Sequence, residues 1–179
     1  MRLALPIRQT WDGQPLPAEE QVELWLSSEP EGLRLELDAP FHGDPPPPGP
    51  PGPTWGLWEH EVVELFLLGA GQRYTEVEIG PHGHHLVLRL QGPRQVRERL
   101  LPLDVQILHK SGRWTARASL PWALLPDGPW RGNAYAIHGL GAARRYLAWT
   151  ALGGERPDFH LLERFPPIDP SLAGGQPQG

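Results

Sequence analysis

The sequence contains no cysteine among its 179 residues. This absence excludes thiol catalysis, zinc–thiolate centres and a disulfide framework. Positive charge is also scarce, because 16 basic residues face 21 acidic ones and the longest basic run is Arg144–Arg145. A nucleic-acid surface needs clustered lysine and arginine, so we do not expect the chain to bind nucleic acid.

Long apolar runs are missing as well. None approaches the ~18 residues that a membrane-spanning helix requires. The apolar stretch that follows Arg2 ends at Arg8, and it is too short for the hydrophobic part of a secretory signal peptide. The sequence therefore predicts a soluble, cytoplasmic protein with no membrane segment.

Proline and glycine are abundant, with 23 and 21 residues, and they divide the chain into short segments. The length fits one domain, which we place at residues 1–170. Residues 45–53 consist only of proline and glycine. They predict a stiff surface loop that cannot join a sheet, because proline has no backbone N–H group to donate. The tail Ser171–Gly179 is expected to be disordered.

Between these proline and glycine residues, the sequence predicts about ten short β-strands. They are expected at residues 21–26, 33–39, 56–68, 74–79, 84–90, 104–110, 114–120, 133–139, 145–150 and 159–165. No long amphipathic helix is present, and Leu120–Leu125 predicts a single helical turn. The pattern indicates an all-β protein, an immunoglobulin-like or jelly-roll β-sandwich with at most one short helical turn.

The densest β-forming run, Gly56–Leu68, carries a carboxylate on an apolar face. Alternation of side chains places Trp58 and Glu64 on one face, with Val62 and Phe66 around the carboxylate. A carboxylate in such surroundings must be ion-paired or must line a pocket. Along a flat strand Trp58 and Glu64 would be about 20 Å apart, so they can contact one ligand only if the chain bends or the sheet curves.

The next run, Tyr74–Leu90, predicts a hairpin that turns at Gly80–Gly83. Glu76 and Glu78 share one face of its first strand. On the returning strand the leucines are expected to face the core. His85, Val87 and Arg89 would then lie on the other face, beside the glutamates. Cross-strand pairing of glutamate with arginine explains this arrangement without a ligand. Carboxylates, arginines and aromatic rings on one sheet face also suit a sugar, and Arg89 is a candidate partner of Glu64.

Metal-binding and catalytic alternatives are weaker. His82, His84 and His85 cluster at the hairpin tip and could bind zinc, nickel or copper, although histidines in turns are usually solvated. Glu76 and Glu78 would be roughly 7 Å apart, within the spacing of inverting glycosidases, but they lie side by side on one strand. No serine nucleophile elbow or phosphate-binding loop is present. We expect no catalytic residue, no metal and no cofactor.

Several motifs together resemble an uncharacterised family of small proteins found in bacteria and animals. They are WEHEVVELFLL from Trp58, YTEVEIGPHGHHLVLRL from Tyr74, LPW from Leu120, AIHG from Ala136 and PDFHLLERF from Pro157. More distantly, the pattern is similar to the family 9 carbohydrate-binding modules and the DOMON-like superfamily, which are β-sandwiches that bind sugars or haem. Haem would need two histidine ligands here, because Met1 is the only methionine.

The resemblance to the sugar-binding modules implies a set of ligand-binding residues. In those modules two tryptophans sandwich a sugar, and a glutamate six residues after the first tryptophan hydrogen-bonds it. Trp58 and Glu64 match that spacing, and Trp149 resembles the second tryptophan. Arg89 and Arg145 are the arginines expected to take hydroxyl groups. The complete set of expected ligand-binding residues is Trp58, Glu64, Glu76, Glu78, His85, Arg89, Arg145 and Trp149.

These observations lead to the hypothesis of a non-catalytic module that recognises a carbohydrate or a similar polyhydroxylated small molecule. Aromatic stacking and hydrogen bonds from glutamate and arginine would provide the recognition. Two alternatives belong to other classes of protein. One is a metal- or carboxylate-dependent hydrolase that uses the histidines with Glu76 and Glu78. The other is a protein-interaction module that acts through the proline-rich loop or a sheet face.

Overall fold

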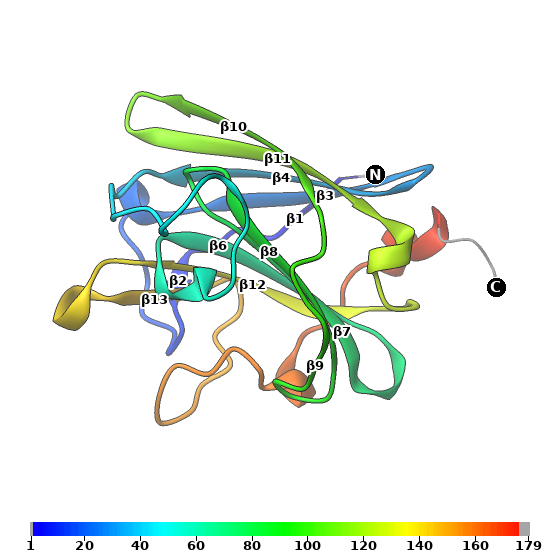
Figure 1. The fold of residues 1–179 in the computed structure, drawn as a ribbon. Coiled ribbons are helices and arrows are strands. Elements are labelled where there is room, and N and C mark those ends of the chain that lie inside the picture. The colour runs from blue at the N-terminus through cyan, green and yellow to red at the C-terminus, as the bar shows by residue number, and fades with distance from the viewer. Residues whose placement is uncertain (1, 176–179) are drawn as a thin grey trace.

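Two β-sheets face each other in the computed structural model, which describes residues 2–175 (Figure 1). The smaller sheet has the order β1 (Arg2–Ala4), β3 (Glu23–Glu29), β4 (Gly32–Pro40), β11 (Arg113–Pro121) and β10 (Asp104–Lys110). The larger sheet has the order β2 (Gln9–Thr10), β13 (Arg145–Ala148), β12 (Arg131–His138), β6 (Val62–Leu68), β7 (Arg73–Ile79), β8 (His84–Gln91) and β5 (Gly52–Pro53), and β9 (Val96–Glu98) also pairs with β8. The predicted β-sandwich is confirmed.

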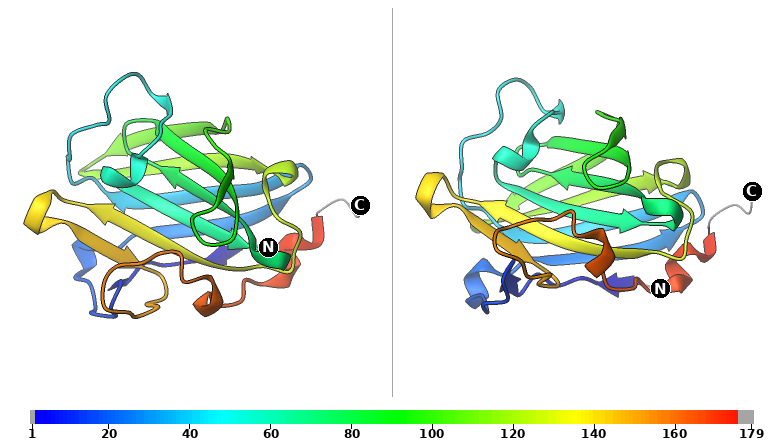
Figure 2. Two further views of the ribbon diagram at one scale, coloured as in Figure 1. Left: turned by 60° about the horizontal axis from the view of Figure 1, so that its bottom comes forward. Right: turned by 90° about the horizontal axis from the view of Figure 1, so that it is seen from below.

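The main hydrophobic core lies between the two sheets. Alternation along the strands supplies it from both sides, with Leu33, Leu35 and Leu37 from β4 and Val63, Leu65 and Leu67 from β6. Burying each such side chain contributes about 1.5–3 kcal/mol relative to leaving it in water. The smaller sheet lies behind the larger one as a second layer (Figure 2, right).

A second apolar cluster covers the outer face of the larger sheet. All seven residues of β6 are buried, because the side chains that do not enter the main core, such as Val62 and Phe66, pack in this cluster. Residues 151–165 cross the outer face and add Leu162 and Phe165 to it (Figure 2, right, orange). The larger sheet is therefore apolar on both faces.

Two strand predictions are wrong in extent or type. The run predicted at 56–68 forms a strand only from Val62, because the 3₁₀-helix η2 (Leu57–Glu59) precedes it. The strand predicted at 159–165 is a loop that contains η6 (Leu162–Arg164). Its apolar residues Leu162 and Phe165 are three positions apart, which is the repeat of a 3₁₀ turn and not of a strand.

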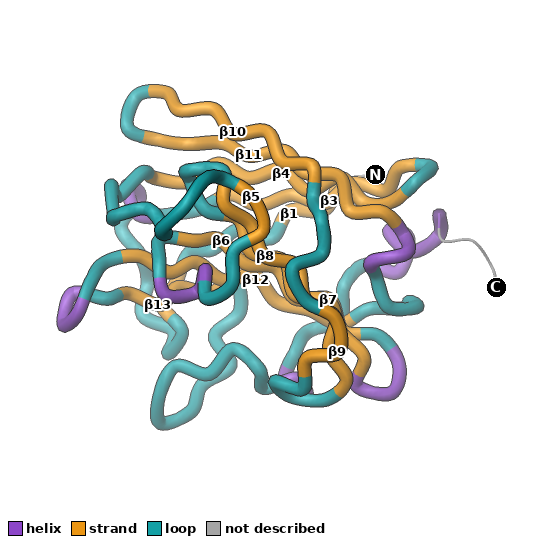
Figure 3. Tube along the Cα trace, in the orientation of Figure 1, coloured by secondary structure: helices purple, strands orange, loops and turns teal. Residues whose placement is uncertain are grey.

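Short helical turns are more numerous than the single one predicted. The described residues contain seven 3₁₀-helices, namely η2 and η6 together with η1 (Ala18–Glu20), η3 (Ala70–Gln72), η4 (Trp122–Leu124), η5 (Gly141–Ala143) and η7 (Pro170–Gly175). Figure 3 shows them in purple, mostly where the chain turns between strands. Six of the seven are only three residues long, so they leave no periodic pattern in the sequence.

The proline-rich run takes part in the sheet, contrary to the prediction. Gly52–Pro53 forms β5, a two-residue strand parallel to β8 at the edge of the larger sheet. Thr54 N–H donates to the carbonyl of His85 at 2.8 Å. An edge position tolerates proline, because the missing N–H would have pointed away from the neighbouring strand.

The C-terminal segment is ordered further than expected. Ser171–Gly179 was expected to be disordered, but η7 occupies Pro170–Gly175, and Leu172 is fully buried in the main core. The rest of that prediction, residues 176–179, lies outside the described residues. Among the helices in residues 2–175, none has the length and apolar character needed to cross a bilayer.

Candidate ligand-binding site

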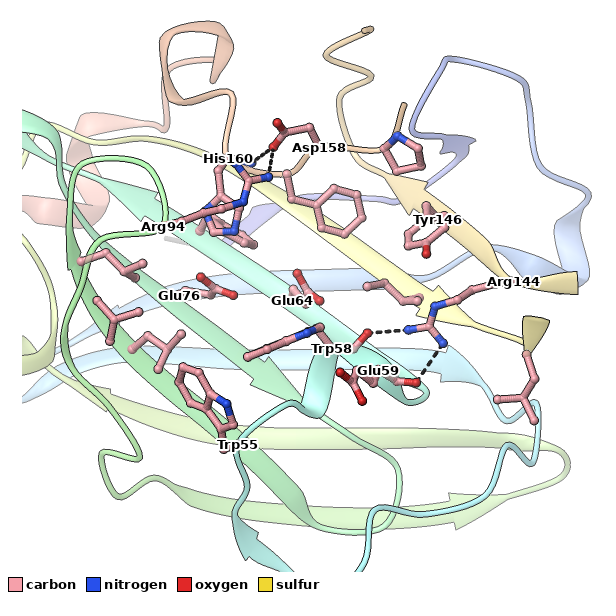
Figure 4. Close-up of a pocket in the computed structure, with 18 of the residues that line it drawn as sticks. Trp55, Trp58, Glu59, Glu64, Glu76, Arg94, Arg144, Tyr146, Asp158 and His160 are labelled. Carbon is pink, nitrogen blue, oxygen red and sulfur yellow. Dashed lines mark hydrogen bonds and ion pairs between the residues drawn. The ribbon is translucent and has the colours of Figure 1, made fainter. Parts of the chain in front are cut away.

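A cavity of about 730 Å³ opens on the outer face of the larger sheet (Figure 4). Strands supply its floor through Glu64, Phe66, Glu76, Leu88, Leu90, Ile137 and Tyr146. Loops supply its walls through Trp55, Trp58, Arg94, Leu140, Arg144, Asp158, Phe159 and His160. The volume lies within the range of roughly 300–1,000 Å³ that is typical of small-molecule sites.

Trp58 reaches this cavity from a helical turn. Gly56 adopts a left-handed conformation with φ +80°, and η2 then carries Trp58 over the sheet. Trp55 meets Trp58 edge to face, with ring centroids 5.1 Å apart, and is 49% exposed. The bend removes the long separation that a flat strand would impose between Trp58 and Glu64. Sequence reasoning missed Trp55, although the spacing Trp-Gly-Leu-Trp could have indicated two neighbouring indole rings.

Glu64 lies on the cavity floor, where only 2% of its surface is exposed. Val62 and Phe66 flank it on the same face of β6. Its Oε1 atom has no hydrogen-bond partner among the described residues. Burial and the neighbouring Glu76 carboxylate raise the pKa of Glu64 well above its ordinary value. The structure places this carboxyl in a pocket, where it forms no ion pair with any other residue of the described part of the chain.

Glu76 and Glu78 of β7 lie beside Glu64. The strand register sets Glu78 opposite Glu64 and Glu76 opposite Phe66. Burial raises the pKa of Glu76 to about 7. Burial and the two neighbouring carboxylates raise the pKa of Glu78 well above its ordinary value. The raised pKa values favour the protonated form of these carboxyl groups, in which they can donate hydrogen bonds as well as accept them.

Arg89 and His85 do not join the glutamates, which corrects the prediction for β8. The register of the hairpin sets Arg89 opposite Thr75 and His85 opposite Ile79, so both face away from the cavity. Arg89 is ion-paired with Glu98 at 3.0 Å. The residues beside the glutamates are leucines instead. Since both faces of this sheet are apolar, the pattern of the leucines could not reveal which face they cover.

Trp149 and Arg145 also lie outside the cavity. Trp149 is half-buried and packs against the main core. The Arg145 guanidinium donates two hydrogen bonds to Glu20, at 2.9 and 2.6 Å. Alternation along β13 turns Tyr146 toward the cavity and its odd-numbered neighbours away. Trp55 lies beside Trp58 in the cavity lining, where Trp149 was expected, and Arg144 lines the cavity where Arg145 was expected.

Arg144 holds the wall that carries the tryptophans. Its guanidinium donates to the backbone carbonyls of Trp58 and, at 2.9 Å, of Glu59 (Figure 4). It also donates to the backbone carbonyl of Gly139 at 3.2 Å, which makes three carbonyls in all. It also lies 5.7 Å from the ring centroid of Tyr146. The planar fork of arginine suits several fixed acceptors at once. Arg144 therefore fixes the position of Trp58 relative to the floor.

The opposite wall is a hydrogen-bonded chain. Arg94 donates to Asp158 at 2.7 Å, and the Asp158 carboxylate accepts the backbone N–H of His160 at 2.9 Å (Figure 4). The Tyr74 hydroxyl lies 2.8 Å from Nδ1 of His160 and accepts the backbone N–H of Arg94 at 3.0 Å. Burial and the Arg94 charge lower the pKa of His160 to about 4. His160 is therefore neutral at physiological pH.

Comparison with known proteins identifies the family of this chain. It is 40% identical over 168 residues to the human UPF0462 protein C4orf33, covering 89% of this chain and 84% of that protein. It is 42% identical over 170 residues to the homologue from Danio rerio, covering 89% of this chain and 85% of that protein. The chain belongs to the UPF0462 family. No family model matches the sequence.

A solved structure shares the fold of this UPF0462 chain. It is a provisionally assigned carbohydrate-binding protein from Bacteroides uniformis, with a TM-score of 0.71 and 16% sequence identity. The likeness covers 92% of this chain and 84% of that one. It supports the two-sheet fold. The relationship to family 9 modules and DOMON-like domains remains a prediction.

The histidines of this UPF0462 chain do not gather into a metal centre. The rings of His82 and Phe41 meet edge to face, with centroids 5.6 Å apart. His84 Nε2 lies 3.3 Å from the Gly49 carbonyl, and His85 is on β8 with its backbone paired to Ile79. Among the described residues, no group of three histidine or acidic side chains is placed to hold a metal ion. The histidine-based hydrolase therefore has no support from this geometry.

Replacing Arg144 with lysine should loosen the tryptophan wall. Lysine keeps the charge but cannot reach three carbonyls in one plane, so we expect the free energy of unfolding to fall by about 1–3 kcal/mol. Chemical denaturation measures this change. Arg117→Lys, at an exposed pair with Glu36, serves as the control. Equal losses in the two variants would contradict the role given to Arg144.

Proposed function

We propose that this protein binds a carbohydrate or a similar polyhydroxylated small molecule in the cavity on the outer face of the larger sheet, without catalysing a reaction. The observation that carries the proposal is that Trp58 and Glu64 line one cavity of about 730 Å³. An indole wall and a buried carboxyl group in one small pocket meet the two needs of a sugar, whose rings have apolar C–H faces and polar edges.

Each part of the cavity has a separate role in the proposed recognition. The sugar ring stacks on Trp58, and Trp55 fixes the Trp58 ring from its edge. Tyr146 bounds the cavity on the side of Arg144 (Figure 4). Glu64 and Glu76 exchange hydrogen bonds with hydroxyl groups, because a protonated carboxyl group can donate and accept at the same time.

The ligand set differs from the one expected from the sequence. Trp58, Glu64 and Glu76 line the cavity and remain in the proposal. Glu78 is fully buried and supports the floor from beside Glu64. The proposed ligand contacts do not include His85, Arg89, Arg145 and Trp149.

A tryptophan-fluorescence titration with neutral mono- and disaccharides tests the proposal. We expect at least one sugar to give a saturable change in the wild-type protein and Trp58→Ala to bind it at least tenfold more weakly. Trp25→Ala is the matched control, because Trp25 lies on β3 of the other sheet beneath Arg2. The proposal fails if the whole panel gives no response, or if Trp58→Ala and Trp25→Ala bind alike.

The same samples separate the two alternatives. Release of hydrolysis products from a bound disaccharide would replace the binding module with a carboxylate-dependent hydrolase. Flat titrations together with capture of residues 45–53 by a proline-recognising domain would instead support the protein-interaction module.

A further inference from the structure

The carboxyl groups on the cavity floor form no ion pair with any side chain in residues 2–175. One oxygen atom each of Glu64 and Glu76 lacks a hydrogen-bond partner among the described residues, while the side chains of Glu76 and Glu78 interact directly and shift each other's pKa. All three side chains are more than nine-tenths buried, and Glu64 and Glu76 line the cavity, where their oxygen atoms point inward (Figure 4). Buried carboxyl groups are normally paired or hydrogen-bonded, so this group requires an explanation.

The charges of the two arginines in the cavity wall partly offset the rise in pKa, Arg144 at Glu64 and Arg94 at Glu76, but neither arginine forms an ion pair with these carboxyl groups. Arg144 directs its N–H groups at backbone carbonyls. Arg94 is paired with Asp158 at 2.7 Å. Each guanidinium is thus held in place by other acceptors, and the glutamates remain open toward the cavity.

Aromatic rings surround the space above these glutamates. Trp55, Trp58, Tyr146 and Phe159 all line the cavity. The faces of such rings attract a cation, and an ammonium group offers three donors and no acceptor. Carboxylates below and aromatic rings around form a site that complements an amine better than a neutral hydroxyl group.

We propose that the ligand carries a protonated amino group that binds between Glu64 and Glu76, so that the preferred class is an amino sugar or another aminated polyol. This inference rests on the proposed function and specifies its ligand. Glutamine side chains would serve neutral hydroxyl groups equally well and would avoid buried charge. Acidic side chains gain an advantage only when a positive charge enters the cavity.

Binding of an amine should release protons from the floor. An ammonium group stabilises the ionised form of the nearby carboxyl groups, whose pKa values burial raises. The charged and titratable groups that face them from the surrounding elements are Glu59, Glu78, Tyr74, Tyr135, Tyr146, Arg94, Arg144, Asp158 and His160. The pKa of Asp158 is lowered and that of Tyr74 is raised, so the released protons come from the glutamates.

Calorimetric titration with matched compounds tests the inference. Glucosamine carries the amine, whereas glucose and N-acetylglucosamine are neutral. We expect glucosamine to bind at least tenfold more tightly at pH 7 than either neutral sugar. The observed enthalpy of glucosamine binding should also depend on the ionisation enthalpy of the buffer, because the buffer takes up the protons that binding releases. Cyclohexylamine, a ring amine without hydroxyl groups, separates the contribution of charge from that of the sugar hydroxyls.

Two variants and four possible results test the amine inference separately from the proposed binding of a sugar. The double variant Glu64→Gln with Glu76→Gln should lose the preference for glucosamine, whereas Glu98→Gln on β9 should keep it. Equal binding of glucose and glucosamine would overturn the amine inference and leave sugar binding standing. Cyclohexylamine binding as tightly as glucosamine would support the amine site and overturn the sugar. No response to any of the four compounds would overturn both.

Discussion

Glu76→Gln should become progressively more stable, relative to the wild type, as the pH rises. Burial raises the pKa of Glu76 from 4.5 to about 7. Between these values the folded state binds more protons than the unfolded state, so the free energy of unfolding falls with increasing pH. The stabilisation from protonated Glu76 is complete below pH 4.5 and is lost above pH 7. Between pH 5 and pH 8, the free energy of unfolding of the variant minus that of the wild type should increase by about 2–3 kcal/mol.

Comparison with the wild type at each pH removes the contributions of groups that do not interact with Glu76. Loss of the Glu76 charge also lowers the pKa of Glu64 and Glu78, and this response favours the variant at high pH in the same direction. His138 and His160, whose pKa values burial lowers to about 4, give the opposite slope between pH 4 and 6.5, but they are present in both proteins. Chemical denaturation at several pH values measures the difference, and Glu98→Gln controls for the loss of an acidic group at the surface. If the difference in the free energy of unfolding between Glu76→Gln and the wild type stayed constant from pH 5 to pH 8, Glu76 would not be held in a desolvated site.

Local patterns in the sequence predicted the strands well where a strand alternates and ends at a turn residue. The hairpins β3–β4 and β10–β11 and the turn between β7 and β8 follow the apolar pattern closely. Glu64 was also found from local information, because a carboxylate between two buried apolar residues conflicts with its surroundings. Such conflicts mark positions that packing alone does not explain.

The faces of β8 could not be assigned from the sequence for a physical reason. Alternation tells which residues share a face, but it cannot tell which face meets the second sheet when both are apolar. Val87 enters the main core, whereas Leu86 and Leu88 join the outer cluster. Because of this ambiguity, Arg89 was predicted on the wrong face of the sheet. Glu64 therefore lacks the arginine partner that the sequence predicted.

The cavity walls depend on contacts between distant parts of the chain. Arg144 binds carbonyls 85 and 86 residues earlier, and Arg94 binds Asp158 64 residues later. No local pattern carries such information. The glutamates of the floor were therefore largely predictable from strands β6 and β7, and the two tryptophans from their spacing, while the other wall residues became visible only in the fold.

Phe66→Ala should cause the largest loss of stability among the residues of the floor. The Phe66 side chain is fully buried. Its ring lies 5.3–6.2 Å, between centroids, from four other rings, those of Tyr74, Tyr135, His160 and Phe165. Removing it creates a hole in the outer apolar cluster, so we expect the free energy of unfolding to fall by about 3–5 kcal/mol in chemical denaturation.

The same substitution should also change the titration of His160, which distinguishes damage at the floor from a general loss of packing. Burial is the main cause of the low pKa of His160, so water that enters beside its ring should raise that pKa from about 4 toward its ordinary value. Nuclear magnetic resonance of the histidine ring protons measures this shift. Phe41→Ala, at a partly exposed ring beside His82 and His109, is the matched control and should leave His160 unchanged. If Phe66→Ala destabilised the protein no more than Phe41→Ala, the outer cluster would not be the packed support that the cavity floor requires.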